Sequence, residues 1–305
     1  MLDLDVGVIY TGERHYMTPL VESLAKSAAG LSLRLILVDN ASADGVASWT
    51  HLCPRTKIVT NSQRYGYAAN LNRILSASDA RYVLLLNTDM YFDVGEQCLA
   101  KMVEFMEQHR GCGVSICRVL HPDGTDGHSA RRFPTWRVIA ARRLGLRRLF
   151  PRSLREHLYG EQDPLGHFAC DWVSGCFMLV RREAFRDVGF FDEQYVKYFE
   201  DVDMCRRMAL AGWQVMFNGQ TFCYHHEQRA SRNIASRDAW RHARAYWRWL
   251  TKWGSARPTA LSGQIAATAQ AERGFRCDPP RAGPPERAAT AFPHASRVSN
   301  PLDRG

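Results

Sequence analysis

The sequence predicts an α/β protein with a doubly wound, mostly parallel central sheet and helices on both faces. Over the first 120 residues, short runs that are apolar throughout alternate with segments of helical periodicity. Strands that are apolar on both sides are typical of parallel sheets covered by helices. Polar side chains also follow several of these runs directly, at the sheet edge where such folds bind their ligands.

The first half of the chain contains most of the expected strands. β-Branched and leucine-rich runs predict strands at residues 6–10, 33–38, 56–60, 81–86 and 113–120. Helical periodicity between them predicts helices at 19–28, 68–78 and 93–109. The third helix is expected to begin at Asp93, because Asp93 and Glu96 have the spacing of a capping box.

The second half is less regular. Residues 131–155 are rich in arginine, and between its prolines this stretch can form one amphipathic helix. The expected elements after it are a strand at 171–180, a short helix from Arg182, strands at 213–217 and 221–225, and a Trp- and Arg-rich helix at 235–253. Residues 255–305 change to Pro, Arg, Ala, Gly and Ser with little periodicity, which predicts a disordered tail.

The composition limits the class of protein. The 305 residues carry a formal charge of +9 and have a pI of about 9.2, so acidic partners such as nucleotides are expected. Nine cysteines without a C-x-x-C pair indicate reduced thiols in a cytosolic protein. No run of about 18 apolar residues occurs, so no transmembrane helix is expected.

Three polar motifs follow apolar runs. Asp39 and Asn40 follow the second expected strand, Asn87 and Asp89 the fourth, and His225 and His226 a late one. Each motif taken alone is also a good turn sequence. Together they suit a nucleotide diphosphate bound with a divalent cation, held by Asp89 and one of the two histidines. A histidine ligand makes Mn²⁺ as suitable as Mg²⁺.

A cluster of three carboxylates lies at the start of an expected helix, in the stretch "VKYFEDVDMCRRMALAGWQV". Glu200, Asp201 and Asp203 lie there within four positions of an otherwise basic chain. A helix N-terminus favours negative charge, so we expect Asp201 to be ionised and able to accept a proton. Asp203 is expected to be structural, as a cap partner or in an ion pair with Arg206 or Arg207.

An ordered set of motifs between about residues 6 and 250 resembles the family-2 glycosyltransferases of the GT-A fold, in their rhamnosyltransferase-like branch. The matching stretches are "VDNASADG", "NSQRYGYAANLNRIL", "YVLLLNTDM", "ARRFPTW", "HHEQRAS" and, most specifically, the segment from Asp171 to Val215. The chain departs from the family pattern after its first strand, where it has "IYTGERH", and in its metal motif, which reads Asn-Thr-Asp.

The resemblance implies a role for individual residues. It implies donor binding by Asp39, Asn40, Arg64, Gly66, Asn70 and Asn87. It implies an acceptor side lined by Trp172, Ser174 and Gly175, and a metal site of Asp89 and His225, with His226 as the alternative. Asp201 would be the general base, and Glu200 would contact substrate hydroxyls.

The resemblance also implies an activity: metal-dependent, inverting transfer of a sugar, with rhamnose as one candidate, from a dTDP- or UDP-linked donor. The acceptor would be a glycan or lipid-linked glycan of cell-surface polysaccharide synthesis. A domain over 1–254 would comprise a nucleotide-sugar-binding half (1–120) and an acceptor-binding half (121–254). The protein would be cytoplasmic, with peripheral contact to the inner face of an anionic membrane through 131–155, although such a basic face is also commonly just solvated.

Two alternatives remain open from the sequence. One is a nucleotide-sugar-binding protein without catalysis, which the Glu200–Asp201 pair disfavours. The other is a basic nucleic-acid-binding protein, for which no recognisable binding motif is present, so no nucleic-acid partner is expected. The tryptophans near the C-terminal end of the expected domain are interpreted as packing residues with a cationic rim.

Overall fold

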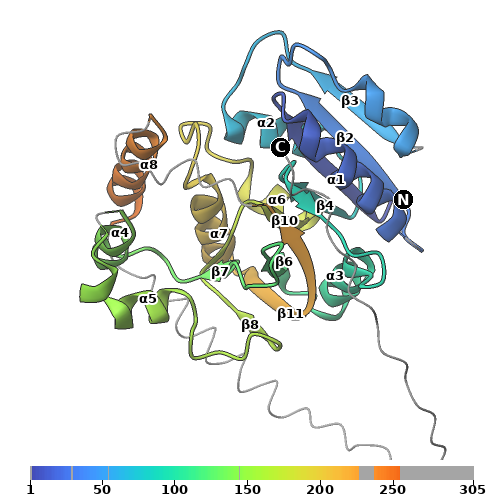
Figure 1. The fold of residues 1–305 in the computed structure, drawn as a ribbon. Coiled ribbons are helices and arrows are strands. Elements are labelled where there is room, and N and C mark those ends of the chain that lie inside the picture. Colours follow the sequence, from blue (N-terminus) through green and yellow to red (C-terminus); the bar gives the residue numbers. More distant parts are fainter. Residues whose placement is uncertain (1, 29, 54, 144, 227–236, 255–305) are drawn as a thin grey trace, which may run out of the picture. The chain divides into compact units, whose positions relative to one another are not determined.

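A computed structural model describes residues 2–254 except 29, 54, 144 and 227–236 (Figure 1). The predicted tail, 255–305, lies outside the described residues. Among the described residues, no helix is both long enough and apolar enough to cross a bilayer.

One nine-stranded sheet organises the fold, in the order β3-β2-β1-β4-β10-β6-β11-β5, with β8 pairing with β11. Its strands are β1 (Leu4–Tyr10), β2 (Leu33–Asp39), β3 (Thr56–Thr60), β4 (Tyr82–Leu86), β5 (Met90–Tyr91), β6 (Cys112–Leu120), β8 (His167–Ala169), β10 (Phe177–Arg181) and β11 (Gln214–His225). Strands β1 to β4 are parallel, and so are β6 and β11. Strand β10 lies antiparallel between β4 and β6. The predicted α/β class is confirmed.

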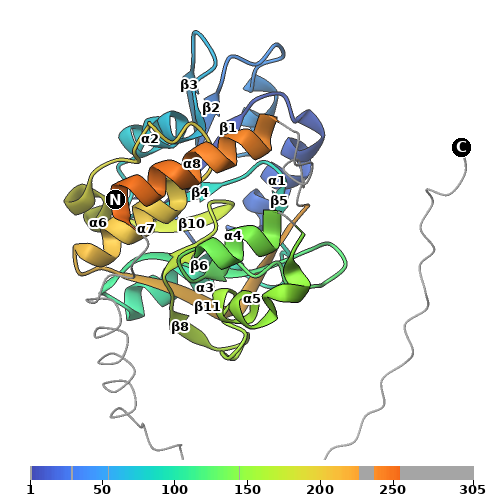
Figure 2. The ribbon, with the colours of Figure 1, turned by 90° about the vertical axis from the view of Figure 1, so that its left-hand side faces the viewer.

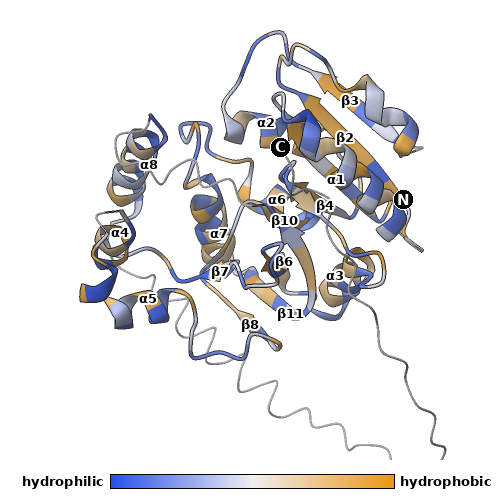
Figure 3. Cartoon of the chain, in the orientation of Figure 1, coloured by the Kyte–Doolittle hydropathy of each residue, from blue (hydrophilic) through white to orange (hydrophobic). Residues whose placement is uncertain are grey.

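Helices cover both faces of this sheet. They are α1 (Arg14–Ser27), α2 (Tyr67–Ala77), α3 (Cys98–Gln108), α6 (Arg182–Val188), α7 (Glu200–Leu210) and α8 (Arg237–Trp253). Helix α2 packs so closely on β1 that a Cβ at Gly7 would lie 2.1 Å from the Ile74 side chain. Helix α3 lies on the other face, where the Ser115 hydroxyl contacts the Met106 sulfur. Strands β1, β2, β4 and β10 are largely hydrophobic between these layers (Figure 3).

Several element boundaries differ from the prediction for local reasons. Helix α3 begins at Cys98 rather than at Asp93, because the Asp93 carboxylate accepts the Gly95 N–H at 2.8 Å and closes a turn. Helix α1 begins at Arg14, before Pro19, which is tolerated inside it. The two late strands form one strand, β11, whose register shifts between Asn218 and Phe222.

Two larger predictions were wrong. The segment between Pro134 and Pro151 is not one helix but two short ones, α4 (Trp136–Arg143) and the 3₁₀ helix η2 (Arg147–Leu149), because Gly145 takes a positive φ of +71°. A further helix, α5 (Pro151–His157), begins at the second proline. The expected strand 171–180 is divided by a turn at 175–176. Its first part, β9 (Trp172–Val173), pairs with β7 (Ala130–Arg131) in a separate sheet, and its second part is β10.

Helix α8 lies beside α7, with the short helices α4 and α5 nearby (Figure 2). Its Ala245 and Trp249 are buried against the rest of the domain. All eight cysteines among the described residues are free and buried.

Candidate active site

The site begins at the carboxyl ends of β1, β2 and β4. Because these strands are parallel neighbours, their last residues meet at one sheet edge, where Tyr10 pairs with Asp39. Asp39 is buried at the end of β2, and one of its carboxylate oxygens accepts the Ser42 N–H at 2.8 Å. The turn expected from this motif therefore forms and fixes the Asp39 carboxylate at the edge.

Asn40 and Asn70 belong to a buried amide network with Asn61. Asn61 Nδ2 donates to Asn40 Oδ1 at 2.9 Å and to Asn70 Oδ1 at 2.7 Å. Asn40 Oδ1 also accepts the Tyr65 N–H, and Asn70 Nδ2 donates to the carbonyls of Tyr65 and Gly66. Since their amides are used in these bonds, these two predicted donor-binding residues hold the loop 61–66 beside the strand ends.

Arg64 and Gly66 lie in that loop. The Arg64 side chain is exposed and donates to the Thr11 carbonyl, just after β1, at 3.2 Å. A Cβ on Gly66 would lie 3.2 Å from the Val196 carbonyl oxygen, which accepts the Tyr67 N–H at 2.8 Å. Gly66 therefore allows the start of α2 to approach the segment that precedes α7.

Asp89 and His225 lie side by side. Strand β5 pairs antiparallel with the end of β11, which brings His225 opposite Met90. His225 Nε2 is 3.1 Å from Asp89 Oδ1. The ring of His226 packs instead against Tyr91, with 4.9 Å between centroids. Of the two candidate histidines, His225 is the one whose ring lies beside the Asp89 carboxylate, whereas His226 donates its backbone N–H to the Asp89 carbonyl at 2.9 Å.

The Asp89–His225 pair fits a divalent cation. A carboxylate oxygen and an imidazole nitrogen are suitable donors for Mn²⁺. Two adjacent ligands of an octahedral ion, each at about 2.1 Å, are about 3 Å apart, as these two atoms are. Within the described part of the chain, no cluster of three or more His, Cys, Asp or Glu side chains has metal-binding geometry.

The protonation of His225 depends on the same neighbours. Burial lowers the pKa of His225, but Cys176 and Asp89 outweigh that effect and raise it to about 10. A protonated ring then balances the Asp89 carboxylate. A cation at this position would replace the proton, since only a neutral imidazole binds metal.

Two backbone N–H groups hold Asp201. Its Oδ2 accepts from Gly175 at 2.9 Å, and its Oδ1 accepts from Val202 at 2.8 Å. Glu200, the first residue of α7, is only 5% exposed. Its Oε2 has no hydrogen-bond partner among the described residues.

This environment distinguishes the two carboxyls. Burial raises the pKa of Asp201, and the N–H groups of Gly175 and Val202 oppose that rise. At Glu200, burial and the charge of Asp201 both raise the pKa, well above its usual value. A proton held by the pair therefore resides on Glu200, and Asp201 is the carboxylate. From the sequence we expected the start of the helix to keep Asp201 ionised. The helix start alone does not do so, because burial raises the pKa of Asp201.

The backbone just before these carboxylates is strained. Tyr198 and Phe199 have φ angles of 74° and 69°, in the left-handed region that bulky residues rarely adopt. Each such residue costs on the order of 1–3 kcal/mol. The Phe199 ring packs against Tyr246 and Trp249 of α8, at centroid distances of 5.7 and 6.2 Å. Packing against α8 thus stabilises the conformation that presents Glu200 and Asp201.

Tyr67 connects the Asp89 motif with the turn that holds Asp201. No role was assigned to Tyr67 from the sequence. Its hydroxyl is 2.9 Å from Asn87 Oδ1 and 3.3 Å from the Gly175 carbonyl. Burial raises the pKa of Tyr67 well above its usual value, so the hydroxyl stays a donor. A tyrosine at the start of a helix that reaches a strand end was the available signal.

The predicted acceptor residues lie around the turn between β9 and β10. Trp172 is buried and donates its indole N–H to the Arg132 carbonyl at 2.9 Å. The Ser174 N–H donates to the Ser129 carbonyl, and Gly175 provides the N–H that binds Asp201. This turn therefore holds the Asp201 carboxylate, while Trp172 connects β9 to the segment before α4.

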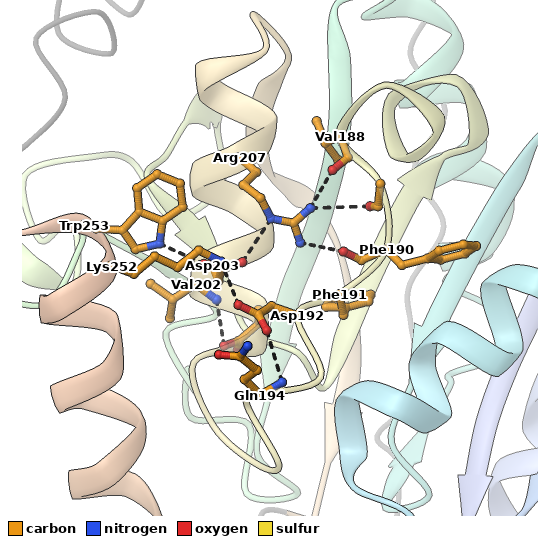
Figure 4. Close-up of polar contacts among 12 residues, drawn as sticks. Val188, Phe190, Phe191, Asp192, Gln194, Val202, Asp203, Arg207, Lys252 and Trp253 are labelled. Atoms are coloured by element: carbon orange, nitrogen blue, oxygen red, sulfur yellow. Dashed lines mark hydrogen bonds and ion pairs between the residues drawn. The ribbon is translucent and has the colours of Figure 1, made fainter.

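Asp203 is structural. It is fully buried, and its carboxylate accepts from Arg207 Nε at 3.0 Å and from Trp253 Nε1 at 2.8 Å, while Lys252 Nζ is 2.8 Å from Oδ1 (Figure 4). The Arg207 guanidinium also donates to the carbonyls of Val188 and Phe190 (Figure 4). Asp203 thus fixes α8 to α7 two residues beyond Asp201.

Comparison with known proteins finds relatives that are named as glycosyltransferases. The chain is 27% identical over 271 residues (79% of this chain, 86% of the relative) to the N-acetylglucosaminyl-diphospho-decaprenol L-rhamnosyltransferase of Mycobacterium tuberculosis. It is 26% identical over 198 residues (62% and 71%) to Rhamnosyltransferase WbbL of Escherichia coli. Among solved structures, the Mannosyltransferase PcManGT from Pyrobaculum calidifontis, in complex with GDP-Man and Mn²⁺, has a TM-score of 0.57 at 18% identity, covering 91% of this chain and 79% of its own.

The structural likeness agrees with the GT-A fold expected from the motifs. The family model of glycosyl transferase family 2 matches residues 5–189, which is more than half of the chain. That range includes the Asp39 turn, the Asp89 motif and the Gly175 turn. The chain therefore belongs to glycosyl transferase family 2.

Proposed function

We propose that this protein is an inverting, metal-dependent glycosyltransferase that moves a sugar from a nucleoside diphosphate to a lipid-linked glycan during cell-surface polysaccharide synthesis. One observation carries the proposal. The Tyr67 hydroxyl lies between Asn87, which begins the motif that contains Asp89, and Gly175, whose N–H holds Asp201. The candidate cation pair and the candidate base therefore share one connected site at the sheet edge.

In the proposed reaction, the donor diphosphate lies at the carboxyl ends of β1, β2 and β4. Asp39 would bind on the nucleoside side, and Arg64 is an exposed cation near the end of β1. Asp89 and His225 would hold a divalent cation, which supplies charge neutralisation for the departing diphosphate. Asn40 and Asn70 act indirectly, by fixing the loop 61–66.

Inversion requires a single displacement. The acceptor hydroxyl oxygen forms a bond to the anomeric carbon as the bond from that carbon to the diphosphate oxygen breaks. Asp201 accepts the hydroxyl proton, and the nucleoside diphosphate leaves with the electron pair of the broken bond. Glu200 stays protonated beside Asp201 and is available to donate to a substrate hydroxyl.

The substrate classes rest on the relatives. Two of them are named rhamnosyltransferases, and the name of one specifies a diphospho-decaprenol acceptor. A dTDP- or UDP-linked sugar, with dTDP-rhamnose tested first, is the proposed donor. A lipid-linked acceptor also agrees with the proposed peripheral contact of residues 131–155 with the inner face of an anionic membrane.

A transfer assay tests the proposal. Purified protein is incubated with dTDP-rhamnose, UDP-sugars or GDP-mannose, with Mn²⁺, Mg²⁺ or EDTA, and with a short-chain polyprenyl diphosphate glycan as acceptor. The expected result is cation-dependent transfer from one donor, giving a product whose anomeric configuration by NMR is inverted. Retention of configuration would contradict the single displacement, and full activity in EDTA would contradict the role of the cation.

A further inference from the structure

Two tryptophans stand on the outer face of α8. Trp240 is 74% exposed and Trp247 is 69% exposed. They are seven residues apart, which places them on the same side of the helix, with the exposed Arg244 between them. The opposite side of α8 carries the buried Ala245 and Trp249. Packing inside the domain therefore uses Trp249 and leaves these two indoles in water.

The exposed face of α8 continues onto the short helices of the basic stretch. A cavity of about 360 Å³ is lined both by Trp136 and Val138 of α4 and by Tyr246 and Leu250 of α8. Trp136 is itself 62% exposed. In Figure 2, α4, α5 and α8 lie together on the side of the domain that faces the viewer. These helices thus form one continuous surface, called here the Trp–Arg face (α4, η2, α5 and the outer side of α8).

The charge of this face is almost entirely positive. The helices α4, η2 and α5 contain seven arginines and one acidic residue, Glu156, which pairs with Arg152. Helix α8 contains four arginines and one lysine, and its one acidic residue, Asp238, pairs with Lys197 and Arg241. A membrane surface rich in anionic lipid attracts such a face by about 1 kcal/mol for each Lys or Arg near it.

We infer that the Trp–Arg face docks on an anionic lipid bilayer, with Trp240 and Trp247 of α8 inserted at the headgroup level. This inference extends the proposed membrane contact of residues 131–155 to helix α8. It rests on the proposed function only for its biological purpose. Nucleic acid would satisfy the arginines but would leave most of the exposed apolar surface of Trp240, Trp247 and Leu149, which is 68% exposed, in water. A bilayer interface accommodates both the arginines and the exposed apolar side chains, because indole rings partition to the headgroup region.

The position of α8 gives the docking a consequence for the site. The Phe199 ring, directly before Glu200, is 5.2 Å from the His242 ring and 5.7 Å from the Tyr246 ring of α8. The helix that meets the bilayer is therefore the helix that packs on the segment carrying the candidate base. A lipid-linked acceptor held in the same bilayer would need to travel only along its surface to reach the site.

Vesicle binding tests the inference without donor or acceptor, so its outcome is independent of the proposed reaction. The full-length chain is mixed with vesicles of phosphatidylcholine containing 30% phosphatidylglycerol, and with pure phosphatidylcholine vesicles, and the bound fraction is measured by flotation. We expect binding to the anionic vesicles only. Trp240→Ser with Trp247→Ser should weaken the partition coefficient at least about tenfold, and Arg244→Glu should weaken it severalfold.

A matched control replaces two apolar residues that are exposed elsewhere, Ile58→Ser on β3 with Leu210→Ser on α7, and should leave binding unchanged. Far-ultraviolet circular dichroism and the melting temperature confirm that each variant is folded. Brominated lipid should quench the wild-type fluorescence, and Trp240→Phe with Trp247→Phe should remove most of that quenching. Equal binding by the wild type and the double serine variant would overturn the inference, as would binding to RNA that competes with vesicles and depends on the arginines alone.

Discussion

Trp253, the last residue of α8, donates its indole N–H to the fully buried carboxylate of Asp203 at 2.8 Å. The same carboxylate pairs with Arg207 and Lys252 (Figure 4). Because Asp203 lies on α7 two residues after Asp201, this bond joins the outer helix to the helix that carries the candidate base. The ion pair with Arg207 is one of the alternatives expected from the sequence.

Asp203→Ala should destabilise the domain strongly. It leaves Arg207 without its buried partner and removes the bond to Trp253, so the free energy of unfolding should fall by about 3–5 kcal/mol. Urea denaturation followed by tryptophan fluorescence measures this change. Glu156→Gln breaks an exposed pair with Arg152 and should cost less than about 1 kcal/mol. Comparable losses in the two variants would show that the Asp203 cluster is not a structural centre.

Asp201→Asn should abolish transfer while leaving donor affinity within about twofold. Asparagine keeps the size of the side chain but cannot accept the acceptor proton, so we expect kcat to fall by a factor of about 10²–10⁴. Glu200→Gln keeps a hydrogen-bond donor at that position and should retain more activity than Asp201→Asn. Calorimetry of donor binding and a steady-state assay separate the two effects. A parallel loss of donor binding in Asp201→Asn would indicate a structural role.

The rate of transfer should fall as the pH is lowered. The pH at which it falls should be higher than the usual pKa of an aspartate. Burial raises the pKa of Asp201, and only the ionised carboxylate accepts a proton. Activity is therefore present above this raised pKa and is lost as the pH falls through it. The measurement is the pH profile of kcat/KM, with the fold of the protein checked at each pH by circular dichroism. An acid limb at the ordinary pKa of an exposed aspartate would contradict the assignment.

His225→Ala and Asp89→Asn should each weaken Mn²⁺ binding at least tenfold in the presence of nucleoside diphosphate. Each removes one of the two donor atoms that lie 3.1 Å apart. His226→Ala is the matched control, since that ring packs on Tyr91 and should leave Mn²⁺ affinity nearly unchanged. Electron paramagnetic resonance of free Mn²⁺ measures the affinity. A larger effect from His226→Ala would exchange the roles of the two histidines.

Tyr67→Phe should lower kcat about tenfold with little change in donor affinity. The hydroxyl lies between Asn87 and the Gly175 carbonyl, so its loss loosens the turn whose N–H holds Asp201. Tyr65→Phe is the control, because the Tyr65 ring packs under Arg73 at 4.4 Å and should tolerate loss of its hydroxyl. Equal activity of Tyr67→Phe and the wild type would remove Tyr67 from the site.

The sequence was informative where one strand or helix decides the outcome. The strand 56–60 was predicted with its observed bounds, and the strand ends that carry Asp39 and Asp89 were located because apolar runs stop there. The β9–β10 division was missed because both strands are apolar, and only the partner strands distinguish them. The single helix expected between Pro134 and Pro151 failed at Gly145, whose positive φ ends the helical path.

Within the site, single residues were easier to find than their relationships. The choice between His225 and His226 depends on which ring faces Asp89, and that follows from the pairing of β5 with β11. The position of Tyr67 at the start of a helix does not by itself indicate its role, because that role depends on Gly175, which is 108 residues away. The exposed side of α8 could not be separated from a packing side without knowing what covers Trp249.

Calorimetric titration of the wild type with a panel of dTDP-rhamnose, UDP-sugars and GDP-mannose, with and without Mn²⁺, measures the donor binding that the proposed function requires. We expect one donor to bind in the presence of the cation, and its affinity should weaken at least tenfold in EDTA and in Asp89→Asn. Failure of the folded protein to bind any donor, or binding unaffected by both EDTA and Asp89→Asn, would contradict the proposed function.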